Sequence, residues 1–353
     1  MKKLIYALAF MPILVSAQDK LGESNYKIFS VKANKEIKLD EIITDMATND
    51  VLFFGEEHND SVDHYLEKTI LEKMYKQYGA NTTLSMEMFE RDVQTTMNEY
   101  LTGLVQEKYF KKDARVWGNY RDYRPMVEFA KENKIDVICA NAPSRYTNIA
   151  GRKGQLALMG LPFESRVNFA PVPYDTASGM YHDKLTGIPI HGPAAADTSK
   201  NKGKDTAKAN PMMMMMGEFN LVMAQSLWDA TMAYSIFDYR KLGKANRHKK
   251  VFQVNGRFHS DEGFGAAAQL KNYDKKIKTL IISSDCDSTF PNIKWDDYKK
   301  NGDYIVITDP KVPKTYDDNP SKPKTENKEV KKEVKKEKKK SIIHIRKAKH
   351  KKK

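Results

Sequence analysis

Cysteines and long apolar runs are scarce in this 353-residue sequence. It contains two cysteines, Cys139 and Cys286, which excludes a disulfide framework, although export would permit a single bridge. Cys139 lies in an apolar run, which predicts a buried and unreactive thiol. Beyond residue 17, no segment approaches the roughly 20 apolar residues of a transmembrane helix. These absences predict a soluble body that is stabilised by its hydrophobic core.

The first 17 residues have the pattern of a secretory signal peptide. Lys2 and Lys3 precede the apolar stretch 4–15, and Val15-Ser16-Ala17 has the small residues of a cleavage site. No cysteine follows the apolar stretch, which argues against a lipid anchor. We therefore expect an exported protein that is periplasmic, associated with the outer membrane, or secreted.

The formal net charge of +14 is concentrated in one segment. Residues 322–353 hold 16 Lys or Arg and 4 Glu, whereas the rest of the chain holds 44 basic and 42 acidic residues. This distribution argues against nucleic-acid binding by the folded body. Residues 311–353 are predicted to be a disordered, lysine-rich tail. The tail either remains solvated or makes weak electrostatic contacts with anionic surfaces, and the second case includes a role in surface adhesion or scaffolding.

Residues 18–310 are predicted to form one α/β domain with a mostly parallel central sheet, flanking helices and a smaller helical subdomain. Strands are expected at 51–55, 82–88, 135–140, 250–255, 278–284 and 303–308. Apolar spacing predicts a helix that begins at Asp60 or Ser61 and ends at Gly79, and further helices at 122–133 and 217–240. Residues 174–216 are predicted to be a flexible, low-complexity insertion. Alternatively, this segment is a mobile flap that brings Tyr181, His182, His191 or methionines to a cofactor.

A Gly-x-x-His pattern occurs twice, each time at the end of an apolar run. Gly55-Glu56-Glu57-His58 follows the run 51–54, and Gly256-Arg257-Phe258-His259 follows the run 251–254. Because open α/β sheets hold their ligands at the carboxyl edge of the strands, both histidines are expected at one site. Glycine allows a sharp turn there and a close approach to the backbone.

Other polar residues are expected at the same edge: Glu87 near the end of the second strand, Asn141 after the third, and His64 at the start of a helix. Three chemistries are compatible with this set. His58, Glu87 and His259 would hold zinc or another divalent metal. Alternatively, His58 would be a general base oriented by Glu87, with His259 polarising a substrate. In the third case, the histidines donate hydrogen bonds to an anionic ligand.

The order of these motifs resembles that of the ChaN-like haem-binding family within the TraB/Tiki superfamily. The resemblance covers roughly residues 45–310 without the insertion. It rests on the segments Gly55–Asp60 with His64, Ser85–Arg91, Trp117 with Tyr120 and Tyr123, Asn141–Tyr146, Gln225 with Asp229, Met232 and Ala233, and Gly256 with His259, Gly263 and Gly265.

The resemblance implies haem binding for iron acquisition, in a homodimer that holds paired haems with tyrosine ligation. Arg145 or Arg257 would then pair with the propionates. The cofactor-binding residues that it implies are Glu56, His58, His64, Glu87, Tyr146 and His259, with Tyr146 as the candidate iron ligand. Related branches of the superfamily imply the alternative of an exported metal-dependent hydrolase, a Tiki-like peptidase that uses His58, Glu87 and His259.

Overall fold

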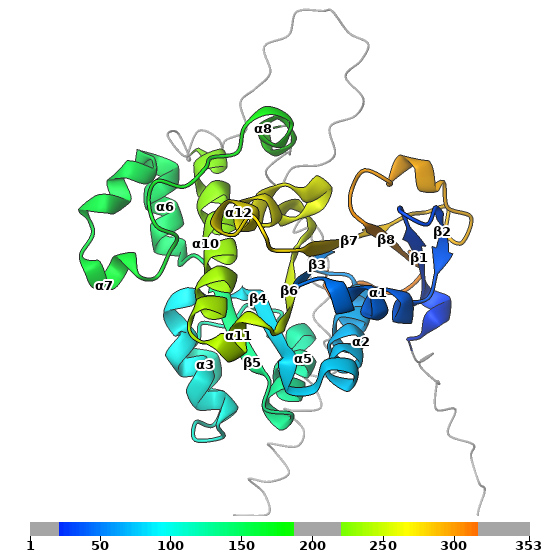
Figure 1. The fold of residues 1–353 in the computed structure, drawn as a ribbon, viewed down its shortest axis with the longest axis horizontal. Coiled ribbons are helices and arrows are strands. Elements are labelled where there is room, and N and C mark those ends of the chain that lie inside the picture. Colours follow the sequence, from blue (N-terminus) through cyan, green and yellow to red (C-terminus); the bar gives the residue numbers. More distant parts are fainter. Residues whose placement is uncertain (1–20, 187–219, 317–353) are drawn as a thin grey trace, which may run out of the picture. The chain divides into compact units, whose positions relative to one another are not determined.

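The structure is a computed structural model that describes residues 21–186 and 220–316 (Figure 1). All described residues up to Thr315 belong to one compact unit. Within the described residues, the strands are β1 (Tyr26–Ser30), β2 (Lys35–Ile37), β3 (Val51–Glu56), β4 (Thr82–Glu90), β5 (Asp136–Asn141), β6 (Lys250–Gly256), β7 (Thr279–Cys286) and β8 (Tyr304–Thr308). The helices are α1 (Leu39–Asp45), α2 (Ser61–Tyr78), α3 (Gln94–Leu101), α4 (Glu107–Asp113), α5 (Tyr120–Glu132), α6 (Ser144–Lys153), α7 (Phe163–Arg166), α8 (Gly179–Thr186), α10 (Leu221–Lys241), α11 (Lys244–Arg247) and α12 (Gly265–Tyr273).

The strands form one mixed sheet in the order β2-β1-β8-β7-β3-β6-β4-β5. The six strands from β8 to β5 are parallel and correspond to the six predicted strands. The α/β fold with a mostly parallel sheet is therefore confirmed. The edge pair β1–β2 is antiparallel and was not predicted. Its strands are short and β2 is largely exposed, so neither strand has the long apolar run by which a buried strand is recognised.

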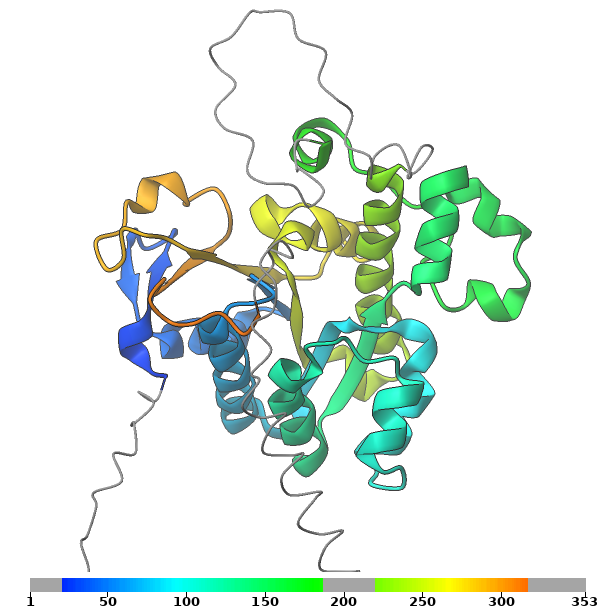
Figure 2. The ribbon, with the colours of Figure 1, turned by 180° about the vertical axis from the view of Figure 1, so that it is seen from behind.

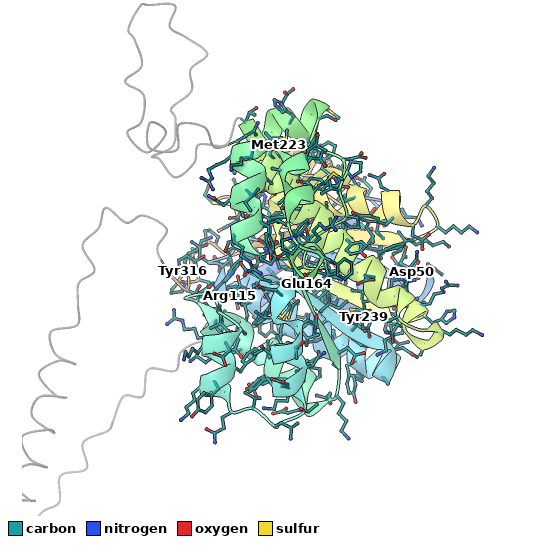
Figure 3. The ribbon with its side chains drawn as sticks, turned by 90° about the vertical axis from the view of Figure 1, so that its left-hand side faces the viewer. Asp50, Arg115, Glu164, Met223, Tyr239 and Tyr316 are labelled. Atoms are coloured by element: carbon teal, nitrogen blue, oxygen red, sulfur yellow. The ribbon has the colours of Figure 1, made fainter. Side chains whose placement is uncertain are left out.

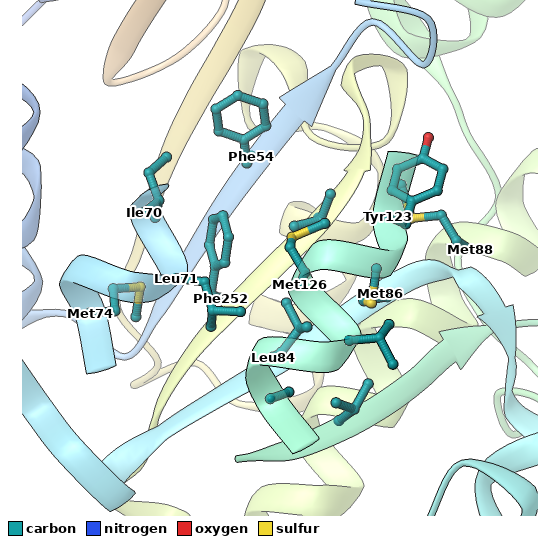
Figure 4. Close-up of a cluster of buried hydrophobic side chains, with 14 of the residues drawn as sticks. Phe54, Ile70, Leu71, Met74, Leu84, Met86, Met88, Tyr123, Met126 and Phe252 are labelled. Atoms are coloured by element: carbon teal, nitrogen blue, oxygen red, sulfur yellow. The ribbon is translucent and has the colours of Figure 1, made fainter. Parts of the chain in front are cut away.

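Helices cover both faces of the sheet (Figures 1 and 2). Successive residues of β3 point to opposite faces, because side chains alternate along a strand. Leu52 and Phe54 pack with α2 and α5, whereas Val51 and Phe53 pack with α10 and α12. Figure 4 shows part of the first cluster, where Phe54, Leu84 and other fully buried side chains fill the space between sheet and helices. The parallel strands are thus buried on both faces, as their near-continuous apolar sequences require.

Helix α2 begins and ends at the residues that its sequence predicts. The Asp60 carboxylate accepts hydrogen bonds from the backbone N–H groups of Val62 and Asp63, at 2.8 and 3.3 Å. These bonds satisfy two of the amides that an α-helix leaves free at its first turn. Gly79 ends the helix with φ +54°, a conformation that glycine adopts at no steric cost. The β3–α2 junction, which carries His58 and His64, is therefore well defined by local contacts.

Residues 144–186 form the smaller helical part, which packs on α10. Within the segment predicted to be a flexible insertion, residues 179–186 form α8, and Tyr181 and Leu185 are buried against Val222 of α10. Residues 187–216 lie outside the described residues, as do the predicted signal peptide and residues 317–353 of the predicted tail. Residues 313 and 315 contact the body, since the carbonyl of Pro313 accepts a bond from Ser61 and the N–H of Thr315 donates to Asn59. None of the helices in the described ranges is both long and apolar enough to cross a membrane.

Candidate functional site

The two Gly-x-x-His motifs lie on neighbouring strands. β3 and β6 pair in parallel, with Glu56 opposite Gly256, so His58 and His259 both follow the carboxyl edge of the sheet. β4 pairs with the other side of β6 and brings Glu87 to the same edge. Gly256, the glycine of the second motif, leaves room for the ring of His58, because a Cβ at this position would lie 2.7 Å from Nε2 of His58. The structure therefore brings together three of the predicted site residues, and we call His58, Glu87 and His259 the strand-end centre.

His259 lies between two carboxylates. Its Nδ1 is 2.6 Å from Oδ1 of Asp229, and its Nε2 is 3.4 Å from Oε1 of Glu87. Burial alone would lower the pKa of His259, but the charges of Glu87 and Asp229 outweigh it and raise this pKa to about 10. Burial would likewise raise the pKa of Glu87, yet His259 and a 2.7 Å hydrogen bond from the N–H of Gly256 hold it at about 2. At neutral pH, His259 is therefore an imidazolium and Glu87 a carboxylate.

Residues from α8 and α10 complete the surroundings of His259. The hydroxyl of Tyr181 donates to Oδ2 of Asp229 at 2.6 Å, and the side-chain amide of Gln225 lies 2.8 Å from Nδ1 of His259. Asp229 is almost fully buried, at 1% exposure. Gln225 and Asp229 were noted in the sequence only as motif positions, and Tyr181 only as part of a possible flap. Their common role depends on α10 crossing the sheet edge, which no local pattern reveals.

His58 is the accessible member of the strand-end centre, with a side chain that is 38% exposed. Its Nδ1 donates to Oε1 of Glu56 at 2.8 Å. Its ring packs edge-to-face with the ring of Trp117, with 5.3 Å between the ring centroids. Burial lowers the pKa of His58, but the hydrogen bond to Glu56 and the charges of Glu56 and Glu87 raise it to about 9. The hydroxyl of Tyr123 also donates to Oε1 of Glu56, at 2.8 Å.

These protonation states favour one of the three chemistries considered for the strand-end centre. Both His58 and His259 carry a proton at neutral pH, so neither accepts a proton readily there. Both nitrogens of His259 already face Asp229 and Glu87, and Nδ1 of His58 bonds to Glu56, so among the described residues Nε2 of His58 is the N–H of this centre left to donate to a ligand oxygen. These protonation states therefore favour a hydrogen-bond donor role for His58 over a general-base role at neutral pH.

A second buried group lies beside His58 and consists of Glu56, His64 and Glu67. Nδ1 of His64 is 3.2 Å from Oε2 of Glu67 and 3.4 Å from Oε2 of Glu56. Burial raises the pKa of Glu56 to about 8 and that of Glu67 to about 7, and the charge of Glu67 adds to the first shift. Glu67 was not predicted as a site residue. Its signal in the sequence is a carboxylate among the apolar residues of α2, one residue after Leu66 and three before Ile70.

Tyr146, the predicted iron ligand, lies in the helical part rather than at the strand-end centre. It is 5% exposed on α6, its ring contacts Phe169 at 4.9 Å, and its hydroxyl accepts a hydrogen bond from Arg145 at 3.1 Å. Asn141 accepts the N–H of Ala142 at the end of β5. Glu57 pairs with Arg257, with 3.3 Å between Oε1 and Nη1.

An apolar groove of about 440 Å³ lies on the helical part, next to Tyr146. Phe169, against which the Tyr146 ring packs, is one of its walls. Its lining residues are Arg91, Met159, Phe163, Arg166, Val167, Phe169, Pro171, Val172, Tyr234 and Asp238. A more polar cleft of about 570 Å³ shares Arg91, Val167 and Asp238 with this groove. Figure 3 looks onto this side of the domain, with Glu164 of α7 and Tyr239 of α10 labelled.

Comparison with known proteins agrees with this architecture. The family model described as haem-binding uptake, Tiki superfamily, ChaN matches residues 42–270. A search of curated proteins found no match. Among solved structures, ChaN of Campylobacter jejuni, a protein with cofacial haem binding, is similar with a TM-score of 0.55 and 14% identity, and the match covers 81% of this chain and 98% of that chain. The type III effector HopBA1 matches with a TM-score of 0.38 and 13% identity, over 76% of this chain and 91% of the other. The structural likeness to ChaN supports the fold, and the family model, which matches more than half of the chain, shows that the chain belongs to the ChaN family of haem-binding uptake proteins in the Tiki superfamily.

Proposed function

We propose that this chain is an exported haem-binding protein of haem and iron acquisition, and that haem binds in the apolar groove of the helical part. The observation that carries the proposal is the groove itself, in a chain that belongs to a family of haem-binding uptake proteins. Its volume of about 440 Å³ lies within the range of roughly 300–1,000 Å³ that is typical of small-molecule sites. The walls formed by Phe163, Val167 and Phe169 suit a flat apolar macrocycle.

Exposed apolar residues beside the groove support this choice. Four large apolar side chains on η5 (Gln155–Gly160), on α7 and directly after α7 are exposed: Leu156 (69%), Met159 (54%), Phe163 (68%) and Val167 (45%). An exposed cluster of this kind marks a binding site more often than single exposed apolar residues do. Bound haem would cover part of this surface and so remove it from water.

The groove also offers the polar groups that haem requires. Tyr234 of α10 lines it, and a phenolate oxygen is a known axial ligand of haem iron. Arg91 and Arg166 are at its walls, where guanidinium groups pair well with propionate carboxylates. Tyr146 remains the candidate from the sequence: its hydroxyl oxygen accepts a hydrogen bond from Arg145, which would also stabilise a phenolate, but Tyr146 is not among the residues that line the groove.

Haemin titration followed by absorbance tests the proposal. The mature chain should give a saturable Soret shift with a fixed number of haems per chain. Tyr234→Phe should change the ligand-sensitive part of the spectrum if Tyr234 holds the iron, and Tyr146→Phe should do so if the sequence candidate is right. Tyr109→Phe is a matched control, because Tyr109 is 52% exposed and is not among the residues that line the groove. A spectrum that never saturates would refute haem binding by this chain.

Export and dimer formation are parts of the same proposal with their own tests. Cleavage after Ala17, detected by mass spectrometry of the chain from whole cells, would support export. A homodimer with paired haems should appear in sedimentation velocity as a change from one to two chains when haemin is added. A monomer at saturating haemin would contradict that part alone.

The strand-end centre supports a second candidate, an exported hydrolase. The specific observation is that His58, with 38% of its side chain exposed, lies with Glu87 and His259 at the carboxyl edge of the sheet, where α/β enzymes hold substrates. A metal bound there would replace the protons that both histidines carry at neutral pH. A metal-dependent peptidase would lose its activity with a chelator and with His58→Ala. Peptide cleavage that persists in His58→Ala would remove this candidate.

A further inference from the structure

The group of Glu56, His64 and Glu67 has the features of a closed cation site. Each residue offers one ligand atom, and these three atoms all lie within 4.8 Å of one another. All three residues are buried, with exposures of 1% for Glu56, 8% for His64 and 0% for Glu67. The donors come from two elements, since Glu56 ends β3 whereas His64 and Glu67 lie one turn apart on α2.

Two carboxylate oxygens in this group lack hydrogen-bond partners. Among the described residues, neither Oε2 of Glu56 nor Oε1 of Glu67 has a donor within hydrogen-bonding geometry. Burial of an unsatisfied carboxylate oxygen is costly, and proteins normally compensate such groups with a donor or with a bound cation. The single imidazole of His64 faces both carboxylates, so satisfying both of them requires a bound cation or a proton shared between Glu56 and Glu67.

We propose that Glu56, His64 and Glu67 bind one divalent transition-metal ion of the zinc class. Bonds of about 2.1 Å to a tetrahedral ion place its ligands about 3.4 Å apart. The separations from Nδ1 of His64 to Oε2 of Glu67 and Oε2 of Glu56 are 3.2 and 3.4 Å, close to this spacing, and the three ligand atoms all lie within 4.8 Å of one another. One nitrogen and two carboxylate oxygens are a ligand set that zinc accepts. The hydroxyl of Tyr123 bonds to Oε1 of Glu56 and so lies beside this group.

The ion would act on the strand-end centre through Glu56. Its Oε2 would bind the metal while its Oε1 continues to accept the hydrogen bond from His58. Nε2 of His64 contacts the carbonyl of His58 at 3.3 Å, so the same ion would fix the loop that carries His58. The site is therefore structural: it ties β3 to α2 and positions His58, and it is independent of haem binding in the groove.

Metal analysis of the full mature chain tests the proposal. After chelator treatment and dialysis, the chain should bind one equivalent of Zn²⁺ in isothermal titration, and its unfolding temperature should rise with Zn²⁺ concentration. Glu67→Gln keeps the shape of the side chain but removes a ligand, and should weaken zinc binding by at least about 100-fold, the upper range for loss of a mere supporting contact. Glu72→Gln is the matched control on the same helix, because Glu72 is 41% exposed and pairs with Lys68.

A second variant distinguishes this site from a metal at the strand-end centre. Glu87→Gln, once shown by circular dichroism to be folded, should leave zinc binding unchanged if the ion lies at Glu67, and should abolish it if the ion lies at the strand-end centre. If Glu67→Gln does not fold, the visible absorption spectrum of the unmodified chain with Co²⁺ tests the site instead. A four-coordinate N/O site gives intense d–d absorption, whereas a hydrated surface ion does not. Absence of stoichiometric zinc, zinc loss in Glu87→Gln with retention in Glu67→Gln, or a hydrated Co²⁺ spectrum would each overturn the proposal.

Discussion

Replacement of Gly256 by alanine should displace His58 while leaving the sheet intact. The backbone of Gly256 has φ −57° and ψ 138°, which any residue adopts, so the substitution causes no backbone strain. The added Cβ would lie 2.7 Å from Nε2 and 2.9 Å from Cε1 of His58. These distances are far shorter than a van der Waals contact, so the imidazole must retreat by about 1 Å. It has room to do so, because 38% of its side chain faces solvent.

The cost follows from the hydrogen bond that this movement breaks. The contact from Nδ1 of His58 to Glu56 is 2.8 Å, and a shift of about 1 Å takes it beyond hydrogen-bonding distance. A hydrogen bond to a charged group contributes about 1.5–3 kcal/mol, and partial exposure of His58 reduces this value. We therefore expect the free energy of unfolding at pH 7 to fall by about 1–2 kcal/mol. Gly118→Ala is the control, because nothing lies within 4 Å of its Cβ position.

Histidine NMR titration gives the more specific readout. In the unmodified chain the hydrogen bond to Glu56 and the nearby carboxylates raise the pKa of His58 to about 9, so the protonated imidazole contributes stability below pH 6.5 and this contribution disappears as the pH rises through 9. In Gly256→Ala the pKa of His58 should move back toward 6.5, and the loss of stability between pH 6.5 and 9 should become smaller. If Gly256→Ala matches Gly118→Ala in both the pKa of His58 and the free energy of unfolding, the close contact does not position His58 and the reasoning is wrong.

Two further predictions concern the buried ion pair and the core. Glu87→Gln leaves His259 with one carboxylate partner, and the free energy of unfolding in urea at pH 7 should fall by about 3–5 kcal/mol. Because the pKa of Glu87 is held at about 2, its contribution in the unmodified chain is present above pH 4.5 and disappears as the pH falls through 2, so the variant should show a weaker acid dependence. An acid profile identical to that of the unmodified chain would contradict the assigned pairing. Leu84→Ala, at a fully buried core position, should cost about 2–5 kcal/mol, whereas Leu104→Ala, at 83% exposure, should stay within about 0.5 kcal/mol. Equal losses for the two leucines would show that burial at β4 is not what stabilises the sheet.

The sequence by itself determined the six parallel strands, the limits of α2 and the position of the two histidines at strand ends. These features are local: an apolar run marks a strand buried on both faces, Asp60 caps the helix and Gly79 ends it. Family membership also followed from the order of the motifs and is confirmed by the family model. The chemistry of His58 and His259 stayed open at that stage, since spacing does not reveal which charges surround an imidazole.

Tertiary structure alone decided the partners of each site residue. Asp229 lies 30 residues from His259 in the sequence, and Tyr123 lies 67 residues from Glu56, so neither contact has a local pattern. Only the packing of α10 and α5 against the sheet brings these side chains to its carboxyl edge, where burial and neighbouring charges set their protonation. The apolar groove is likewise built from Arg91, the 159–172 segment and Tyr234, which are distant in sequence. Helices and strands form from local sequence patterns, whereas the functional sites form from contacts between these elements. The composition of a site therefore depends on the tertiary structure.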